Sequence, residues 1–339
     1  MKSLRSLRRA RGISLIEILI SLAIGMVVVV AVIVSYLGSG QASRYHTALT
    51  QMNQDAQTGL NMLAREIQLA GYSAPAALSG ANPSVISYYN LACPTGGCPL
   101  PLLAATTGGT AGYIFGCDAT KGTAPFTDAT ADVLACQPAG ATRSSGFGVV
   151  YEADVKNTVA VTVAATGLLT PTNCKGEALT VTTPAIGLPY YIARNRYYVD
   201  TQTGANTTGR PELYCASAGS NGVPFIENVD DMQVWYGLAT ATVTSAPASR
   251  QVTRYVQAGK DATTPGTVNA INAATPGEWE KVVAVRICLL MRSAEPVLTA
   301  EDSATYQPCD SNAAVATSAD GYLRRAYYTT ATLRSKMAY

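Results

Sequence analysis

The chain begins with an apolar run that is long enough to cross a membrane. Residues 13–37 form a stretch of 25 residues that contains a single charged side chain, Glu17. At a rise of about 1.5 Å per residue, a helix of this length exceeds the roughly 30 Å hydrocarbon core of a bilayer. We therefore expect a helix that lies in a membrane or in an equally apolar assembly.

The charges around this run predict its orientation. Five basic residues and no acid precede it: Lys2, Arg5, Arg8, Arg9 and Arg11. Such a cluster favours a cytoplasmic N-terminus, with the remainder of the chain exported. A secretory signal would have a shorter apolar core and a small-residue cleavage site, so we expect a retained helix. The remaining 19 basic and 22 acidic residues give no global basic surface for nucleic acid.

Glu17 needs an explanation, because an acid at the bilayer centre costs about 2.5–3.5 kcal/mol on insertion scales. Glu17 lies about one helical turn into the apolar run, so its carboxylate could reach the headgroups. Alternatively, the carboxylate meets a positive partner inside an assembly of helices, where each charge alone would be costly. The physical chemistry of the residue leaves both interpretations open.

The segment "RGISLIE", Arg11–Glu17, with the bases before it, resembles the class III signal of type IV prepilins. The resemblance implies that a prepilin peptidase cuts between Gly12 and Ile13 and methylates the new amine of Ile13. Glu17 would then be the fifth residue of the processed chain, where it would pair with the terminal amine of a neighbouring subunit. Ile13 stands where that family more often has Phe or Met.

A second helical pattern follows the apolar run. In residues 44–71, apolar side chains recur with steps of three and four residues, which predicts one stripe along a helix. The stripe is expected to pack on a globular domain and comprises Tyr45, Leu49, Met52, Ala56, Leu60, Leu63, Ile67 and Ala70. Gly71 and Pro75 predict the end of the helix. His46, the single histidine, flanks the stripe, and we interpret it as a solvent-facing or interfacial residue.

Beyond residue 75, short β-branched and aromatic runs predict antiparallel sheet. The expected strands are Phe147–Ala153, Thr158–Ala165, Tyr190–Asp200, Met232–Ala239, Val282–Arg292 and Arg325–Arg334. Two stretches of low complexity, 93–146 and 240–277, are expected to form long surface loops or insertions.

Four blocks of sequence resemble, in order, the PilW-type minor pilins of type IV pili: 59–75, 226–237, 282–296 and 321–335. The resemblance implies an α+β, type IV pilin-like fold, in which a long N-terminal helix packs on an antiparallel β-sheet domain with long loops. The expected organisation is a leader peptide at 1–12, a transmembrane and assembly helix at 13–37, its amphipathic continuation at 38–74, and an exported β-rich domain at 75–339.

All eight cysteines follow the membrane segment, and an even number in an exported domain predicts disulfides. Sequence alone cannot choose their connectivity, and we expect sequential pairing: Cys93–Cys98, Cys117–Cys136, Cys174–Cys215 and Cys288–Cys309. The segment "CPTGGC" has a spacing near that of zinc ligands. It lacks a second close pair and a following histidine, so a metal site is not expected.

The sequence gives little support for catalysis. No Walker A, GxSxG or HExxH motif occurs, and the single histidine lies outside any motif. Asp230 and Asp231 could be mistaken for a catalytic or metal dyad. Neighbours in a strand point to opposite faces, so a solvated turn or strand-entry role is expected. We predict neither an enzyme nor a cofactor.

The resemblance implies a minor pilin that takes part in initiating and assembling a type IV pilus for adhesion and twitching motility. Its implied partners are the prepilin peptidase, other minor pilins, the major pilin and a tip adhesin. It would be a single-pass inner-membrane protein with a periplasmic domain before it enters the pilus, at its tip. The alternatives are a J-type pseudopilin of type II secretion, a signal-anchored periplasmic enzyme or binding protein, and a DNA-binding tip subunit. The last would use Arg324, Arg325, Arg334 and Lys336.

Overall fold

The computed structural model divides the chain into two compact units, residues 1–50 and 51–339, which we describe separately. It describes the following residues: 14–72, 75–76, 87–88, 103–105, 110–111, 113–121, 124–126, 133–134, 136–137, 143–182, 190–201, 209–240, 251–259, 270–272, 279, 281–298, 304–310 and 313–336.

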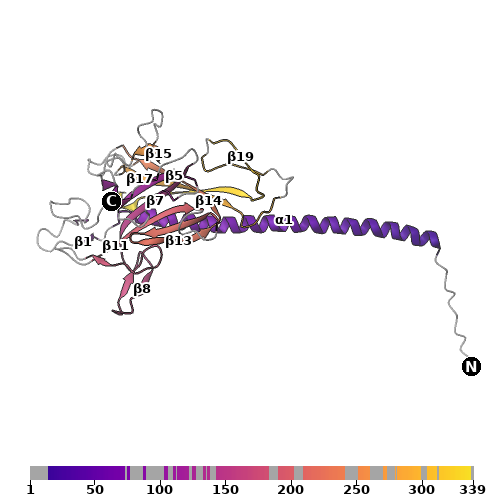
Figure 1. Cartoon of the computed structure of the whole chain (residues 1–339), viewed down its shortest axis with the longest axis horizontal. Coiled ribbons are helices and arrows are strands. Elements are labelled where there is room, and N and C mark those ends of the chain that lie inside the picture. The colour runs from indigo at the N-terminus through magenta and orange to yellow at the C-terminus, as the bar shows by residue number, and fades with distance from the viewer. Residues whose placement is uncertain are drawn as a thin grey trace, which may run out of the picture. The chain divides into compact units, whose positions relative to one another are not determined.

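One long helix, α1 (Leu15–Leu69), contributes to both units (Figure 1). Its C-terminal end follows from the backbone at Gly71, which has a φ of 73°, in the left-handed region that glycine adopts readily. The amide of Gly71 donates a hydrogen bond of 2.8 Å to the carbonyl of Val150. The predicted stop at Gly71 is therefore correct, and the helix end is attached to the sheet beside it.

The larger unit contains two main sheets. The six-stranded sheet has the order β13-β12-β11-β7-β5, with β10 also paired to β11, and all its pairs are antiparallel. Its strands are β5 (Ile114–Thr120), β7 (Arg143–Ala153), β10 (Val181–Thr182), β11 (Tyr190–Asp200), β12 (Glu212–Ser217) and β13 (Ser220–Glu227).

The five-stranded sheet has the order β16-β15-β14-β17-β20 and is antiparallel except for the β15–β16 pair. Its strands are β14 (Val229–Leu238), β15 (Arg254–Gly259), β16 (Ala270–Asn272), β17 (Val282–Arg292) and β20 (Arg324–Thr332). Strand β17 lies between β14 and β20 and is buried along nearly its whole length, and its sequence is correspondingly almost continuously apolar.

Short elements complete the described structure. The two-stranded sheets are β1 (Pro75–Ala76) with β2 (Ser87–Tyr88), β8 (Ala160–Thr162) with β9 (Leu169–Pro171), and β18 (Ala304–Tyr306) with β19 (Ala316–Ser318). A three-stranded sheet contains β3 (Leu103–Ala105), β4 (Thr110–Ala111) and β6 (Val133–Leu134). A 3-10 turn, η1 (Arg334–Lys336), follows β20.

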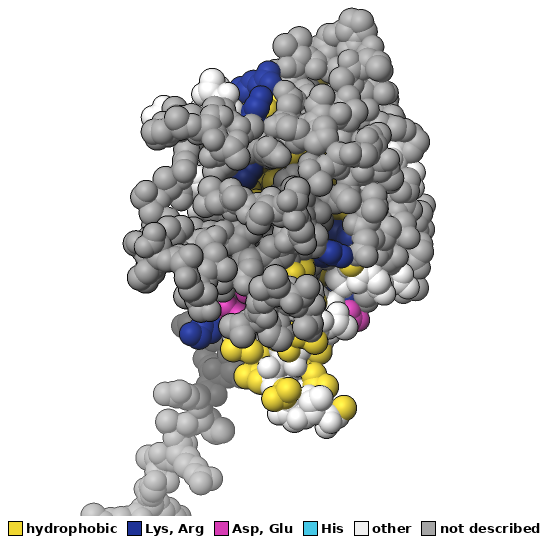
Figure 2. Space-filling model, turned by 90° about the vertical axis from the view of Figure 1, so that its left-hand side faces the viewer, with side chains coloured by type: hydrophobic (Ala, Val, Ile, Leu, Met, Phe, Trp, Pro, Cys, Tyr) yellow, Lys and Arg dark blue, Asp and Glu magenta, His cyan; other side chains and the backbone are white. Residues whose placement is uncertain are grey.

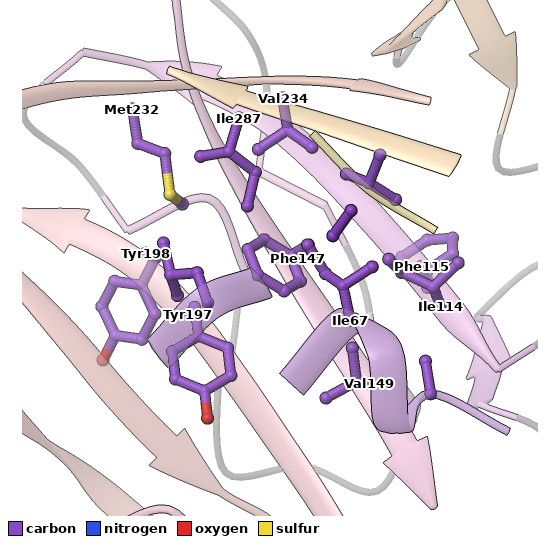
Figure 3. Close-up of a cluster of buried hydrophobic side chains, with 14 of the residues drawn as sticks. Ile67, Ile114, Phe115, Phe147, Val149, Tyr197, Tyr198, Met232, Val234 and Ile287 are labelled. Atoms are coloured by element: carbon purple, nitrogen blue, oxygen red, sulfur yellow. The ribbon is translucent and has the colours of Figure 1, made fainter. Parts of the chain in front are cut away.

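The core lies where the end of α1 meets both sheets. Figure 3 shows Ile67 of α1 among Phe147 of β7, Val234 of β14 and Ile287 of β17, all of them fully buried. The stripe is buried from Met52 onwards, whereas Tyr45 is 37% exposed. The expectation that the stripe packs on the domain is therefore correct for its second half.

The predicted strands match the structure in most cases. The two strands 190–200 and 282–292 have the predicted bounds. The predicted strand 147–153 lies within β7, and the predicted strand 232–239 overlaps β14 and extends one residue beyond its end. Only three residues of the predicted strand 158–165 form a strand, β8.

The expectation of two long surface loops is wrong for part of each stretch. The stretch 93–146 contains β5, in which Ile114 and Phe115 are buried, and 240–277 contains β15, in which Val256 and Ala258 are buried. Each strand contributes only a few apolar side chains to the core, between segments rich in Thr, Gly and Pro that conceal the pattern in sequence.

Candidate assembly surface

Glu17 lies in the first turn of α1, and the amides of Glu17 and Ile18 donate to the carbonyl of Ser14 at 3.0 and 3.2 Å. Ser14 therefore occupies the N-cap position, and Glu17 is the third helical residue. Serine followed three residues later by glutamate is the spacing of a capping box, in which the carboxylate can satisfy a backbone amide at the helix start. Sequence reasoning did not consider this spacing for Glu17.

The rest of the first unit is an apolar helical surface. Sixteen large apolar side chains between Leu15 and Tyr36 are exposed in the chain, by 51% to 79%. By length and composition, α1 is long enough and apolar enough to cross a membrane. A soluble monomer rarely leaves a patch of this size uncovered, so this helix surface needs lipid or apolar partners. Gly12 and Ile13, the predicted cleavage and methylation residues, lie outside the described part of the chain.

Polar contacts fix the second half of α1 on the domain. Glu66 accepts hydrogen bonds from the amide of Asn195 at 2.9 Å and from the hydroxyl of Tyr151 at 3.2 Å. Burial raises the pKa of Glu66 above its ordinary value, although these hydrogen bonds oppose the shift. Further along the helix, Tyr327 of β20 donates to the side chain of Asn53 at 2.6 Å. None of these residues stood out in the sequence, because each partner lies far away along the chain.

His46 is exposed, and its ring lies edge-on to Tyr45 with centroids 6.0 Å apart. The structure thus places His46 at solvent within the first unit, in keeping with the surface role expected for it. Among the described residues, no group of three or more His, Cys, Asp or Glu side chains could hold a metal ion.

Asp230 and Asp231 are both buried, with 9% and 8% of their surfaces exposed, so a solvated turn is wrong for them. The alternative of a strand-entry position is correct, because β14 begins at Val229. A register shift between Val229 and Asp231 interrupts the alternation of faces on which the expectation of a solvated position depended. Asp230 pairs with Arg324 at 2.5 Å and with Arg292 at 3.9 Å. Asp231 accepts a hydrogen bond from Gln233 at 3.1 Å, and burial raises its pKa to about 6. The two acids have separate partners and form no dyad.

Two of the four bases near the C-terminus already interact with other groups of the fold. Arg324 pairs with Asp230 and also with Asp320 at 2.6 Å. Lys336 is buried, and its ammonium group lies 3.4 Å from the carbonyl of Trp279. Only Arg325 and Arg334 of the four bases are exposed. The observation that favoured a DNA-binding subunit is therefore weaker in the structure than in the sequence.

Three disulfides are present in the described residues: Cys117–Cys136, Cys174–Cys215 and Cys288–Cys309. These are three of the four pairs that sequential connectivity predicts. Cys93 and Cys98, the remaining pair, lie outside the described residues.

A second exposed apolar surface was not foreseen. The β8–β9 hairpin exposes Val159 by 73%, Leu168 by 63% and Leu169 by 57%. Figure 2 shows hydrophobic side chains gathered on a projection at the lower side of the domain, where Figure 1 places β8.

Comparison with known proteins gives two family matches. Residues 7–33 match the Prokaryotic N-terminal methylation motif, and residues 196–335 match the family described as Type IV Pilus-assembly protein W. Among solved structures, a type IV-like pilin from Thermus thermophilus has 12% sequence identity and a TM-score of 0.31, over 87% of this chain and 100% of that chain. No curated protein matches the chain significantly.

This chain combines a methylation motif at the start of a long apolar helix with an antiparallel β-sheet domain, an arrangement that fits a type IV pilin. Its α+β fold is the one that the resemblance implied. The two family matches together fit a type IV minor pilin of the PilW type. The methylation motif implies processing by a peptidase and assembly with other pilins, and proteins of this class are generally non-enzymatic.

Proposed function

We propose that the chain is a minor pilin that helps to initiate and assemble a type IV pilus used in adhesion and twitching motility. The observation that carries the proposal is the coincidence of the methylation motif with an exposed apolar helix whose first turn holds Glu17. The proposed partners are other minor pilins, the major pilin and a tip adhesin, and the role requires no catalysis.

In this proposal, the peptidase cuts between Gly12 and Ile13 and methylates Ile13, which places a positive amine near the start of α1. Glu17 of one subunit then pairs with that amine on a neighbour. Both charges would be costly alone in an apolar helix bundle, so each favours assembly in the one register that brings them together.

We propose a cytoplasmic N-terminus and a periplasmic domain before the protein enters the pilus tip. The five bases before the apolar run support this orientation. Disulfides form and persist in oxidising compartments such as the bacterial periplasm, so the three described bridges also support it.

The capping-box position of Glu17 requires a test that separates helix capping from pairing. Glutamine at the third helical position can still cap the helix, but it carries no charge. We expect Glu17→Gln and Glu17→Ala to insert in the membrane equally well and to reduce surface pili and twitching by a similar large factor. Circular dichroism of the purified full chains would report helix content, which Glu17→Gln should retain.

Normal piliation in the Glu17→Gln strain, with a defect confined to Glu17→Ala, would assign Glu17 to capping and overturn the proposed pair.

A deletion strain distinguishes a pilus subunit from a pseudopilin of type II secretion. Lost twitching with normal protein secretion supports a pilus subunit, whereas lost secretion with normal twitching would place the protein in a type II secretion system.

A further inference from the structure

The last strand of the domain, β20, forms one edge of the five-stranded sheet. It runs for nine residues and pairs with β17 without any register shift. Residues 321–339 contain no proline. Natural proteins usually protect long, regular edges with proline, bulges or charges, because an open edge is a template for another strand.

Strand β13, at an edge of the six-stranded sheet, shows such protection in the same molecule. It carries Pro224 within the strand and Glu227 at its end. Its pairing with β12 has two register shifts. The edge strand β13 is interrupted, whereas the edge strand β20 is regular. Regular pairing is therefore not shared by all edge strands of this chain.

The register shows which backbone groups of β20 face outward. The amide of Ser293 donates to the carbonyl of Leu323, and the amide of Leu333 donates to the carbonyl of Val283. Odd-numbered residues of β20 therefore direct their backbone groups toward β17, because antiparallel strands alternate residue by residue. The backbone groups of Ala326, Tyr328, Thr330 and Thr332 face the open edge, where no described residue pairs with them.

The exposed side chains on this edge and just after it include two cations. Tyr328 is 40% exposed, and Thr330 and Thr332 are exposed beside it. Residues 321–339 hold four bases and no acid, of which Arg325 and Arg334 are exposed. Neither forms an ion pair within the described part of the chain.

A third cation stands on the neighbouring strand. The exposed guanidinium of Arg286 lies 5.7 Å from the ring centre of Trp235 and 4.9 Å from that of Tyr328. The hydroxyl of Tyr328 in turn donates to the carbonyl of Cys309 at 3.1 Å, next to the Cys288–Cys309 bridge. These contacts hold the Arg286 charge in place, and no acid within the described residues neutralises it.

We propose that the β20 edge binds an extended, acidic segment of another polypeptide, which adds to the sheet as a further strand. Backbone hydrogen bonds to Tyr328, Thr330 and Thr332 would supply affinity, and acidic side chains facing Arg325 and Arg286 would supply specificity. A second copy of this chain is a poorer partner, because it would bring two edges of the same sign together. The inference names a partner chemistry for the proposed assembly role and rests on that role for its biological setting.

The test uses the purified full chain in detergent and short synthetic peptides of alternating valine and threonine. One peptide carries two glutamates and the other carries two lysines. We expect the glutamate peptide to bind and to slow hydrogen exchange in 326–332, and the lysine peptide to bind at least about tenfold more weakly. Equal binding of the two peptides, or protection of the β8–β9 hairpin instead of β20, would overturn the proposal.

Thr330→Pro removes an outward-facing amide without breaking the ladder to β17, and Thr330→Ala is its matched control. We expect roughly tenfold weaker peptide binding for Thr330→Pro and little change for Thr330→Ala. Equal binding by both would exclude the edge. If Thr330→Pro fails to fold, the Arg286→Glu, Arg325→Glu double variant serves instead, and it should prefer the lysine peptide.

Two further outcomes separate this proposal from others. Self-association of the unliganded chain that Thr330→Pro abolishes would identify a second copy as the occupant and overturn the inference. The Glu17→Gln chain should bind the glutamate peptide like the unaltered chain. The proposal of strand addition at β20 and the proposed pairing of Glu17 can therefore be disproved independently of each other.

Discussion

The carboxylate of Glu66, near the end of α1, accepts a hydrogen bond of 2.9 Å from the side-chain amide of Asn195 on β11. This contact joins residues 129 positions apart and connects the helix with the middle of the six-stranded sheet. Tyr151 donates to the same carboxylate, and its own pKa is raised chiefly by burial and then by the nearby Glu66 charge.

The raised pKa of Glu66 predicts a dependence of stability on pH. A carboxyl group that holds its proton more tightly in the folded state contributes most to stability at pH values below its unfolded-state pKa, near 4.5. That contribution is lost as the pH rises through the folded pKa. The thermal unfolding midpoint of the unaltered chain, taken relative to that of the Glu66→Gln variant, should therefore fall as the pH increases above about 4.5. Glu295→Gln, at a side chain that is 74% exposed, is the control and should leave the pH profile unchanged.

A bulky residue at Gly12 should block processing. In the Gly12→Val strain, we expect the chain to retain residues 1–12 and to remain in the membrane without entering pili. Mass spectrometry of the N-terminus gives the readout: the unaltered chain should begin with N-methylated Ile13. An unaltered chain that kept its leader while supporting normal pili would contradict the expected cleavage.

The Cys288–Cys309 bridge should contribute measurably to stability. Both cysteines are buried, and they lie 21 positions apart in the sequence. Replacing both by alanine should lower the free energy of unfolding by about 2–4 kcal/mol, measured by denaturant titration without reductant. Because Tyr328 donates to the carbonyl of Cys309, the same variant should also bind the glutamate peptide more weakly.

Gly116 and Tyr236 should show strong coupling across the core. A Cβ at Gly116 would collide with the hydroxyl of Tyr236, which is buried without a hydrogen-bond partner among the described residues. We expect Gly116→Ala to destabilise the chain by about 2–3 kcal/mol through overpacking. Tyr236→Phe should be neutral or stabilising by up to about 1 kcal/mol, because it removes an unsatisfied buried hydroxyl.

The double variant completes that cycle. Tyr236→Phe should recover part of the loss caused by Gly116→Ala, because it removes the atom closest to the added methyl group. Strictly additive changes in the free energy of unfolding would show that the two positions do not meet in the core as described.

The parts of the fold that sequence reasoning predicted have continuous local patterns. The helix end at Gly71 and the strand β17 both followed from patterns carried by their own residues. Strand β5 was missed because Ile114 and Phe115 are flanked by Gly, Thr and Ala, and its burial depends on β7, whose pairing residues begin at Arg143. Short strands of this kind become recognisable only through their partners.

Some residues of the candidate site could be identified from sequence patterns, and others could not. Glu17 was identified because a lone acid in an apolar run is rare, and its pairing with a neighbouring amine stays a prediction. The β20 edge was not foreseen, because openness is a property of sheet order and has no signature in the sequence of the strand. The buried positions of Asp230 and Asp231 were missed because one inserted residue interrupts the alternation.

The cysteine connectivity has a consequence for how the domain matures. For each of the three described bridges, the partner of the first cysteine is the next cysteine along the chain. If the domain enters the periplasm from the end that follows the membrane helix, each of these three bridges has its correct partner available before any competitor that follows it. Oxidation in order of arrival yields these three bonds directly, so their formation should need a thiol oxidant during export but little help from enzymes that reshuffle mismatched pairs.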